Sequence, residues 1–302
     1  MANLREIKRR IKSVQNTQKI TQAMRMVAAA KVKKAENAVK ASKPYSEELI
    51  KAFTRVMETN PVIGNKEMKT RLAIDNYPAL LSQRDIKTVG LLVITSDKGL
   101  AGAYNANIVR RAVSRIKELK QSGLQVKLFV VGQKGLNALK NTDNEIINNY
   151  VKLPAIPTVS NGSVIVEDIA EAYVKAEIDK IEVITTKFKS LMSFEVQNFQ
   201  LLPVEVSQEK KENIIQEEML FEPSPEDVLS KIVPLYLSNR VYQSLLESAA
   251  SELAARMTAM AAATKNASEM IHKLSLIYNK ARQSSITQEL LEVVSGANAL
   301  KG

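Results

Sequence analysis

Apolar residues recur with helical spacing at both ends of the chain. Near the N-terminus they are separated by 3, 4 and 3 residues, at Leu4, Ile7, Ile11 and Val14. This heptad pattern is typical of a helix that packs along one seam. Polar Thr17 and Gln18 interrupt it, which predicts a stutter. We expect the seam to resume at Ile20, Met24 and Val27 and to continue through Ala28, Val32, Ala35 and Val39.

The first helical pattern contains a proline and continues beyond it. Pro44 would clash with the carbonyl of Lys40, so a kink or restart is predicted there. Leu49, Phe53 and Val56 carry the apolar spacing onward.

The C-terminal pattern predicts a second and longer helix. Ser224-Pro225-Glu226-Asp227 is a favourable helix start, and Pro234 follows as a possible kink. Apolar residues then recur every four positions and later at 3 and 4, as Val241, Leu245, Ala249, Leu253, Met257, Met260, Thr264, Ala267, Ile271, Leu274, Tyr278 and Ala281. A helix over 226–300 would span roughly 110 Å and must pair with another element. The N-terminal helix is the obvious partner.

Glycine separates these two arms from the middle of the chain. None occurs in residues 1–63 or 163–295, whereas eight of the ten lie between Gly64 and Gly162. In the middle, short apolar runs alternate with helical patterns, which indicates a mostly parallel, Rossmann-like sheet. The expected strands are 88–95, 126–131, 145–150, 181–187 and 194–202, and the expected helices are 106–120, 133–140 and 164–178.

The predicted fold is therefore α/β plus a long antiparallel α-helical coiled coil, with a Rossmann-like central domain inserted between the N- and C-terminal helices. The expected segments are an N-terminal coiled-coil helix at 1–60, a linker at 61–87, the Rossmann-like domain at 88–204, an acidic connection at 205–224 and a C-terminal coiled-coil helix at 225–302.

Charge is distributed unevenly within a net charge of +11. Residues 1–40 hold eleven Lys or Arg against two acids, whereas residues 205–230 hold eight acids against two Lys. The basic arm, residues 1–40, has three interpretations: a solvated helix face, a nucleic-acid site or a surface for acidic protein loops. It contains no aromatic residue to stack on bases, and nucleic-acid binding would weaken steeply with salt.

The sequence has few residues of the types that usually form catalytic sites. There is no Cys, and His272 is the single histidine, so a catalytic triad or a clustered metal site is not expected. The loop Ser96–Asn105 has two glycines but is not a dinucleotide fingerprint, and Gly132–Gly135 is too short for a phosphate loop. We interpret the first mainly as a structural turn, with an anion or protein contact as the alternative. A Rossmann-type enzyme would have to bind ATP or NAD by itself.

Four stretches resemble one family. The segment Ile286-Thr287-Gln288-Glu289-Leu290-Leu291-Glu292-Val293-Val294-Ser295-Gly296-Ala297-Asn298-Ala299 is similar to the signature of the γ subunit of F-type ATP synthases. Residues 11–31, 252–260 and 278–283 resemble the same family, in the same order along the chain. The resemblance implies a non-catalytic rotor that stands inside a hexamer of α and β subunits and turns with the membrane c ring. No cofactor and no nucleic acid are implied.

The resemblance also implies site residues and partners. Contacts with the α and β subunits are expected at Arg9, Lys12, Met24, Arg25, Arg282, Gln283, Thr287 and Glu289. A foot region that contains Phe221 and Glu222 would lie near ε and the c ring, with δ, a and b as further members of the complex. The resemblance implies a peripheral location, on the cytoplasmic face of a bacterial plasma (inner) membrane, and the sequence shows no run of 18 apolar residues and no targeting peptide.

Overall fold

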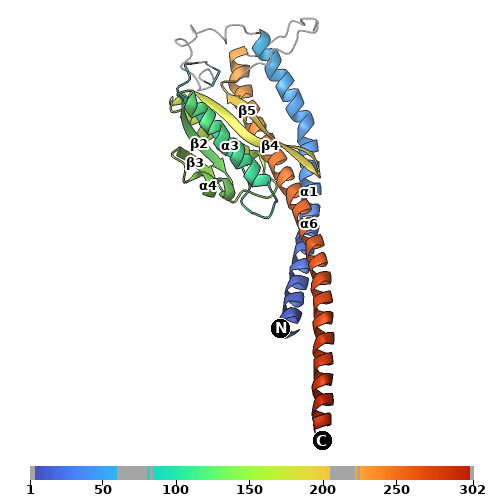
Figure 1. Cartoon of the computed structure of the whole chain (residues 1–302). Coiled ribbons are helices and arrows are strands. Elements are labelled where there is room, and N and C mark those ends of the chain that lie inside the picture. Colours follow the sequence, from blue (N-terminus) through green and yellow to red (C-terminus); the bar gives the residue numbers. More distant parts are fainter. Residues whose placement is uncertain (1–3, 60–79, 82–83, 205–221, 223–224, 300–302) are drawn as a thin grey trace. The chain divides into compact units, whose positions relative to one another are not determined.

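The computed structural model describes residues 4–59, 80–81, 84–204, 222 and 225–299 (Figure 1). Its contacts form two compact units. The shaft unit comprises Met1–Ala29 and Arg256–Gly302, and the central unit comprises Ala30–Ala255. Both unit boundaries fall within the two longest helices, α1 (Leu4–Thr59) and α6 (Pro225–Ala299). The expected linker at 61–87 and the connection at 205–224 lie mostly outside the described residues.

A five-stranded sheet forms the middle of the central unit, with strand order β3-β2-β1-β4-β5. The first four strands are parallel, and β5 pairs antiparallel with β4. The chain order is β1 (Thr88–Ile94), α3 (Tyr104–Gln121), β2 (Gln125–Val131), α4 (Gln133–Leu139), β3 (Glu145–Tyr150), α5 (Val159–Val174), β4 (Lys180–Ser190) and β5 (Ser193–Leu202). The predicted Rossmann-like arrangement between two long helices is confirmed.

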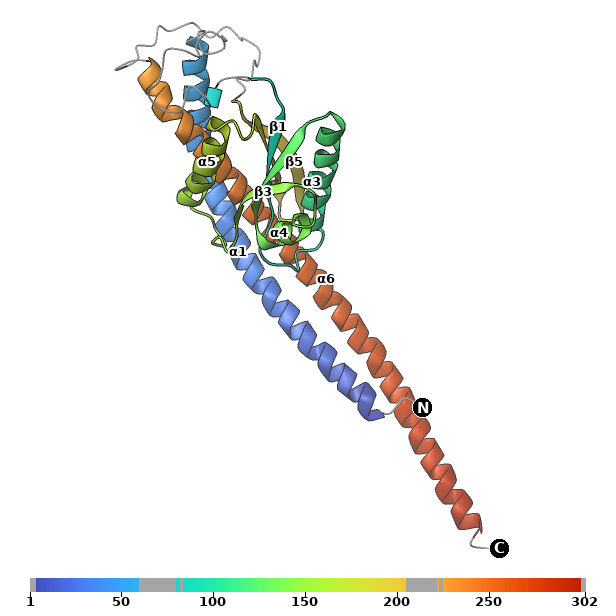
Figure 2. The ribbon, with the colours of Figure 1, turned by 90° about the vertical axis from the view of Figure 1, so that its left-hand side faces the viewer.

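Two apolar layers cover the sheet, one on each face, because parallel strands bury both faces. Helices α3 and α5 lie on opposite sides of the strands (Figure 2). Ile108, Ala112 and Ile116 of α3 pack in one layer with alternate residues of β1 and β2. Ile165 and Ile169 of α5 pack in the other layer together with the first turns of α6.

One expected helix is displaced along the sequence. The predicted span 164–178 is observed as Val159–Val174. The helix starts early because Asn161 Oδ1 accepts hydrogen bonds from the backbone N–H of Thr158 (2.9 Å) and from its hydroxyl (3.0 Å). It ends early because Ala176 adopts a left-handed backbone conformation at φ 58°. Apolar spacing alone misses both local signals.

In the central unit α1 and α6 pair in antiparallel fashion. The rings of Phe53 and Tyr236 stack at 4.5 Å, and Gln243 Nε2 donates to Ser46 Oγ at 2.6 Å. Further along the pair, Val32 and Ala35 pack on Ala250, Leu253 and Ala254. The helix α1 runs through Pro44 without interruption, so the predicted restart is wrong. Packing on α6 on both sides of Pro44 supports the helix despite the lost backbone hydrogen bond.

The seam of α1 in the shaft unit also differs from the prediction. Ile20 and Val27 are 60% and 56% exposed, whereas Thr21 is only 9% exposed. Gln18 is half-buried, so the original 3-and-4 spacing continues through polar positions to Thr21, Met24 and Ala28. The predicted interruption at Thr17 and Gln18 is therefore wrong. Polar residues such as Gln18 and Thr21 occupy seam positions here, so a polar side chain does not by itself mark a break in the seam.

A buried charge cluster links the sheet to α3. The carboxylate of Glu182 in β4 accepts two hydrogen bonds from the Arg115 guanidinium, both at 2.8 Å, and one from Asn198 Nδ2 at 2.9 Å. Lys180 Nζ lies 3.2 Å away. Burial by itself raises the pKa of Glu182, but these partners outweigh burial and lower it to about 2.

We predict that Glu182→Gln destabilises the central unit by about 2–3 kcal/mol at pH 7, because it leaves Arg115 without its buried counter-charge. A depressed folded-state pKa stabilises the protein above the unfolded value of about 4.3, and this stabilisation is lost as the pH falls toward about 2. Urea unfolding of the full chain between pH 7 and pH 2.5 measures both effects. The variant should lose less stability than the wild type over the acid range. Glu195→Gln, which removes an exposed carboxylate that pairs with Lys189 at 2.6 Å, is the control and should cost less than about 1 kcal/mol.

Close packing of α5 on α6 depends on Gly162. A Cβ built there would lie 3.0 Å from Ser238 O and 3.1 Å from atoms of Tyr242. The glycine therefore sets how closely the two helices approach.

We predict that Gly162→Val lowers stability by about 2 kcal/mol, because the added side chain overpacks this contact. Thermal unfolding of the full chain measures the loss. Gly296→Ala is the matched control, since nothing lies within 4 Å of a Cβ at that helical position. It should be neutral or slightly stabilising, and an equal loss in both variants would contradict the packing explanation.

Candidate partner-binding surface of the paired helices

In the shaft unit α6 extends beyond the start of α1. The Thr21 and Thr264 hydroxyls lie 2.9 Å apart and fix the level of the two antiparallel helices. Leu4 lies 17 positions before Thr21, and Ala281 lies 17 positions after Thr264. Because the helices are antiparallel, Leu4 and Ala281 therefore lie at about the same level. The following part of α6, 282–299, is roughly 27 Å of helix with no segment of α1 beside it. We call it the tip.

The tip carries an exposed apolar stripe. The stripe has helical spacing and consists of Ile286, Leu290, Val293 and Val294, which are 48% to 69% exposed. Polar side chains on the tip bond along the helix, as Thr287 Oγ1 donates to Gln283 O at 2.9 Å and Ser285 Oγ to Glu289 Oε1 at 3.3 Å. Arg282, Gln283, Thr287 and Glu289 are all exposed on this segment. A single amphipathic helix of this kind needs an apolar partner.

The predicted contacts on α1 lie on the paired part of the shaft unit. Arg9, Lys12 and Arg25 are exposed, and no described carboxylate lies within 4 Å of their charged groups. Met24 is half-buried at the seam. The four α1 residues and the four tip residues therefore occupy different lengths of the same unit, and the structure does not gather them into one compact site.

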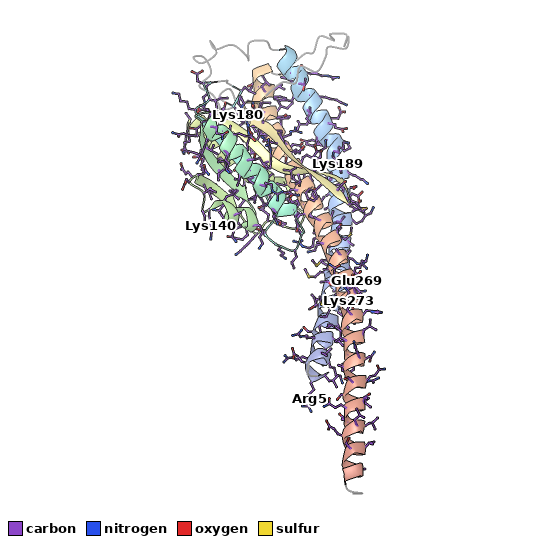
Figure 3. The ribbon with its side chains drawn as sticks, viewed as in Figure 1. Arg5, Lys140, Lys180, Lys189, Glu269 and Lys273 are labelled. Atoms are coloured by element: carbon purple, nitrogen blue, oxygen red, sulfur yellow. The ribbon has the colours of Figure 1, made fainter. Side chains whose placement is uncertain are left out.

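The shaft unit carries a net positive charge, which lies on its paired part, since the tip holds one Arg against two Glu. Its described residues carry twelve Lys or Arg against four Asp or Glu. The labelled side chains of Arg5, Glu269 and Lys273 stand on the outside of the two helices (Figure 3). Arg10 pairs with Glu6 at 2.8 Å, a surface contact of small energy. This distribution favours an acidic partner.

Three apolar residues on α1 were not predicted as surface residues. Ile20, Met26 and Val27 are more than half exposed, and Met26 lines a shallow groove of about 390 Å³. The groove is otherwise lined by Arg25, Ala29, Met257, Thr258 and Ala261, so one cation borders an apolar surface. Continuing the first heptads through Gln18 would have placed Ile20 and Val27 off the seam. The signal was therefore present in the sequence.

The foot region is only partly described. Phe221 lies outside the described residues, and Glu222 is exposed in a bend before α6. Ser224, the expected helix cap, also lies outside them.

The position at which Rossmann folds bind nucleotides is filled by this chain's own helix. Such ligands bind beyond the carboxyl ends of the strands, where the strand order reverses, which here is between β1 and β4. Tyr104 OH lies 2.6 Å from Ser248 Oγ of α6, and Thr185 of β4 donates to Ser244 O of α6 at 3.3 Å. Burial raises the pKa of Tyr104 to about 12, so the phenol stays neutral. The crevice is a packing contact.

The glycine-containing loops beside this edge also make structural contacts. A Cβ at Gly132 or Gly135 would meet Thr95 at 2.5–2.6 Å, and Gly135 N–H donates to Thr95 Oγ1 at 2.9 Å. In the Ser96–Asn105 loop, Asp97 accepts the Gln133 N–H at 2.9 Å, and Asn105 accepts the Ser96 N–H at 3.0 Å. The loop is thus held rigidly and presents Leu100 to solvent at φ 63°.

Neither a metal-binding cluster nor a membrane-spanning helix is found in the described part of the chain. It holds no group of three or more His, Cys, Asp and Glu side chains placed to bind a metal ion. None of its helices combines the length and the apolar character needed to cross a bilayer. His272 is exposed on α6.

Comparison with known proteins identifies the family. Residues 3–300 match the sequence model of the ATP synthase family. The chain is 42% identical to the ATP synthase gamma chain of Synechococcus sp. (strain JA-2-3B'a(2-13)), over 99% of this chain and 100% of that one. It is also 42% identical to the gamma chain of Nostoc punctiforme, with the same coverage.

Solved structures agree with this assignment. The chain resembles a chain of the central stalk and c ring of the Tetrahymena thermophila mitochondrial ATP synthase, with a TM-score of 0.57, 26% identity and coverage of 81% of this chain and 99% of that one. A chain of the Euglena gracilis mitochondrial ATP synthase shares the fold, with a TM-score of 0.65 at 17% identity and coverage of 98% and 94%. On this full-length similarity, the chain belongs to the ATP synthase gamma-chain family.

Proposed function

We propose that this chain is the non-catalytic shaft of its complex and that the shaft unit contacts the catalytic hexamer of α and β subunits. As a gamma-chain family member, it is a rotor subunit of an F-type ATP synthase. The observation that carries the proposal is the exposed, basic and apolar surface of the shaft unit, which needs a partner that surrounds it.

The surface has two parts with different chemistry. The tip presents its apolar stripe around a single helix, which suits an apolar sleeve formed by the hexamer. The paired part presents Arg9, Lys12 and Arg25, which suit acidic loops of the β subunits. Arg282, Gln283, Thr287 and Glu289 lie on the tip itself beside the apolar stripe, where polar contacts with β loops complete the interface.

The remaining partners follow from the same assignment. Glu222, together with Phe221, belongs to the foot that contacts ε and the c ring, with δ, a and b in the same complex. The protein is peripheral, on the cytoplasmic face of the bacterial plasma membrane, and the c ring provides its membrane attachment. Rotation of the c ring turns the shaft, and the shaft forces the catalytic sites of the hexamer through successive states.

Catalysis is assigned to the partners, and packing in the central unit supports this. A nucleotide would have to displace α6 from Tyr104 and Thr185, which would expose buried side chains of both elements. The Rossmann-like sheet therefore serves as a packing surface for the part of α6 that belongs to the central unit. Titration of the isolated chain with ATP or NAD should show no binding.

We predict that the triple reversal Arg9→Glu, Lys12→Glu and Arg25→Glu impairs coupling far more than folding. The three side chains are exposed, so their loss costs the shaft little, while the contact with acidic β loops becomes repulsive. Thermal unfolding of the chain and ion pumping per ATP hydrolysed by the assembled complex measure the two effects. Lys117→Glu, Lys120→Glu and Lys140→Glu in the central unit are the charge-matched control. If the shaft helices melt instead, the cations stabilise the arm itself.

We further predict that Leu290→Asp with Val294→Asp weakens association with α and β by about 100-fold, since each buried side chain contributes at least about 1.5 kcal/mol. The tip is not packed on α1, so the melting temperature of the isolated chain should not change. The amount of chain retained by immobilised α and β subunits measures association. Gln288→Asp on the polar side of the tip is the control. Full retention of the double variant would exclude an apolar sleeve around the tip.

A further inference from the structure

Two threonines meet across the seam of the shaft unit. Thr21 Oγ1 on α1 and Thr264 Oγ1 on α6 are 2.9 Å apart, although they are separated by 243 positions in the sequence. Thr21 is buried, and its neighbours at the seam include Ala28, Met260 and Ala267. The hydrogen bond is therefore a polar contact between two helices at a position where apolar residues are usual.

The hydroxyl protons limit how this contact is arranged. Thr21 Oγ1 is also 3.0 Å from Gln18 O, and Thr264 Oγ1 is 2.8 Å from Met260 O, each within its own helix. A hydroxyl has one proton, so one threonine donates to its own helix and the other donates across the seam. The cross-helix bond is thus made at the expense of a local one, which is available to an isolated helix as well.

The apolar contacts around the pair define the axial position weakly. Ala28 and Ala267 have small side chains, and residues 259–263 of α6 are alanine except for Met260. A displacement by one helical turn would place similar small groups opposite each other. A groove of about 390 Å³ lined by Met26, Ala29, Met257 and Ala261 lies on this side of the pair. A hydrogen bond, unlike an alanine contact, tolerates no such displacement.

We infer that the Thr21–Thr264 hydrogen bond fixes the axial register of α1 and α6 in the shaft unit, and that this register is needed for transmission of rotation. A slip by one turn would move the α1 cations by about 5.4 Å relative to the tip. It would also place Thr21 level with an apolar part of α6. The claim about transmission of rotation rests on the proposed rotor function, whereas the claim about register does not. The experiment therefore measures the register of the helices and the coupling of the complex separately.

Register is measured by the distance between spin labels in the full chain assembled with its partner subunits. The chain has no Cys, so labels can be placed at chosen positions before assembly. Pairs of introduced cysteines at Gln15 with Lys280, and at Lys8 with Glu269, are offset along the helix axis in opposite directions, and all four sites are exposed. A slip lengthens one distance and shortens the other, whereas separation of the helices lengthens both.

The test variant is Thr21→Val with Thr264→Val, which keeps side-chain volume and removes both hydroxyls. We expect a second population shifted by about 5 Å in opposite directions for the two label pairs, and at least a twofold loss of ion pumping per ATP hydrolysed. Thr21→Ser with Thr264→Ser retains the hydroxyls and should behave as wild type. Thr17→Val is the matched control, because Thr17 is exposed and bonds only within α1, to Ser13 O at 3.1 Å.

Two results would overturn the inference. One is a single, unchanged distance for both label pairs in the valine variant. The other is a shifted register with wild-type coupling, which would remove the role in transmission. If the double valine variant does not assemble, Thr21→Val alone is judged by the same criteria. Failure of the wild-type complex to pump would instead contradict the proposed rotor function, and the distance measurement would remain readable.

Discussion

Residues 241–255 of α6 are enclosed by other parts of the central unit, and the arrangement of that unit depends on this enclosure. Leu245 packs in the layer that contains α5, Ala250 packs on α1, and Ser248 bonds to Tyr104 beside the other face of the sheet. The helix therefore crosses the carboxyl edge of the sheet while it contacts three separate elements. Burial of nearly every side of a helix is typical of a core element, and here it ties a long surface helix to an α/β domain.

This enclosure explains why α6 occupies the strand ends at which a Rossmann-like domain would hold a ligand. The polar residues at that edge are satisfied by α6 or by neighbouring loops, as in the bonds of Thr185 with Ser244 O and of Thr95 with Val131 O. A ligand at this position would compete with contacts that hold α6 on the sheet within the central unit. The same fold element that binds nucleotides elsewhere thus acts here as an anchor, which is consistent with a mechanical subunit.

The two units differ in how their helices are paired. In the central unit the pair contains large side chains such as Phe53 and Tyr236, whereas in the shaft unit the seam around the threonine pair contains alanines and a methionine, and the larger Ile7 is buried nearer the start of α1. Large interlocking side chains resist displacement, while small ones allow close approach but define position weakly. Apolar side chains that the shaft seam does not use, including Ile20, Val27 and Leu290, remain on the surface for partners.

The sequence by itself determined which segments are helices and strands, because glycine placement, apolar spacing and turn residues are local properties. It also placed the basic arm and, through four matching stretches, the family. The 3-and-4 spacing continued through Gln18 to Thr21 also placed Ile20 and Val27 off the seam, so their exposure was readable from the sequence. Two features were decided only by the tertiary structure. Packing on α6 carried α1 through Pro44. The position of α6 on the carboxyl edge filled the Rossmann crevice. Each depends on contacts between residues distant in the chain, and the spacing of apolar residues along one helix does not specify which of its faces another helix will cover.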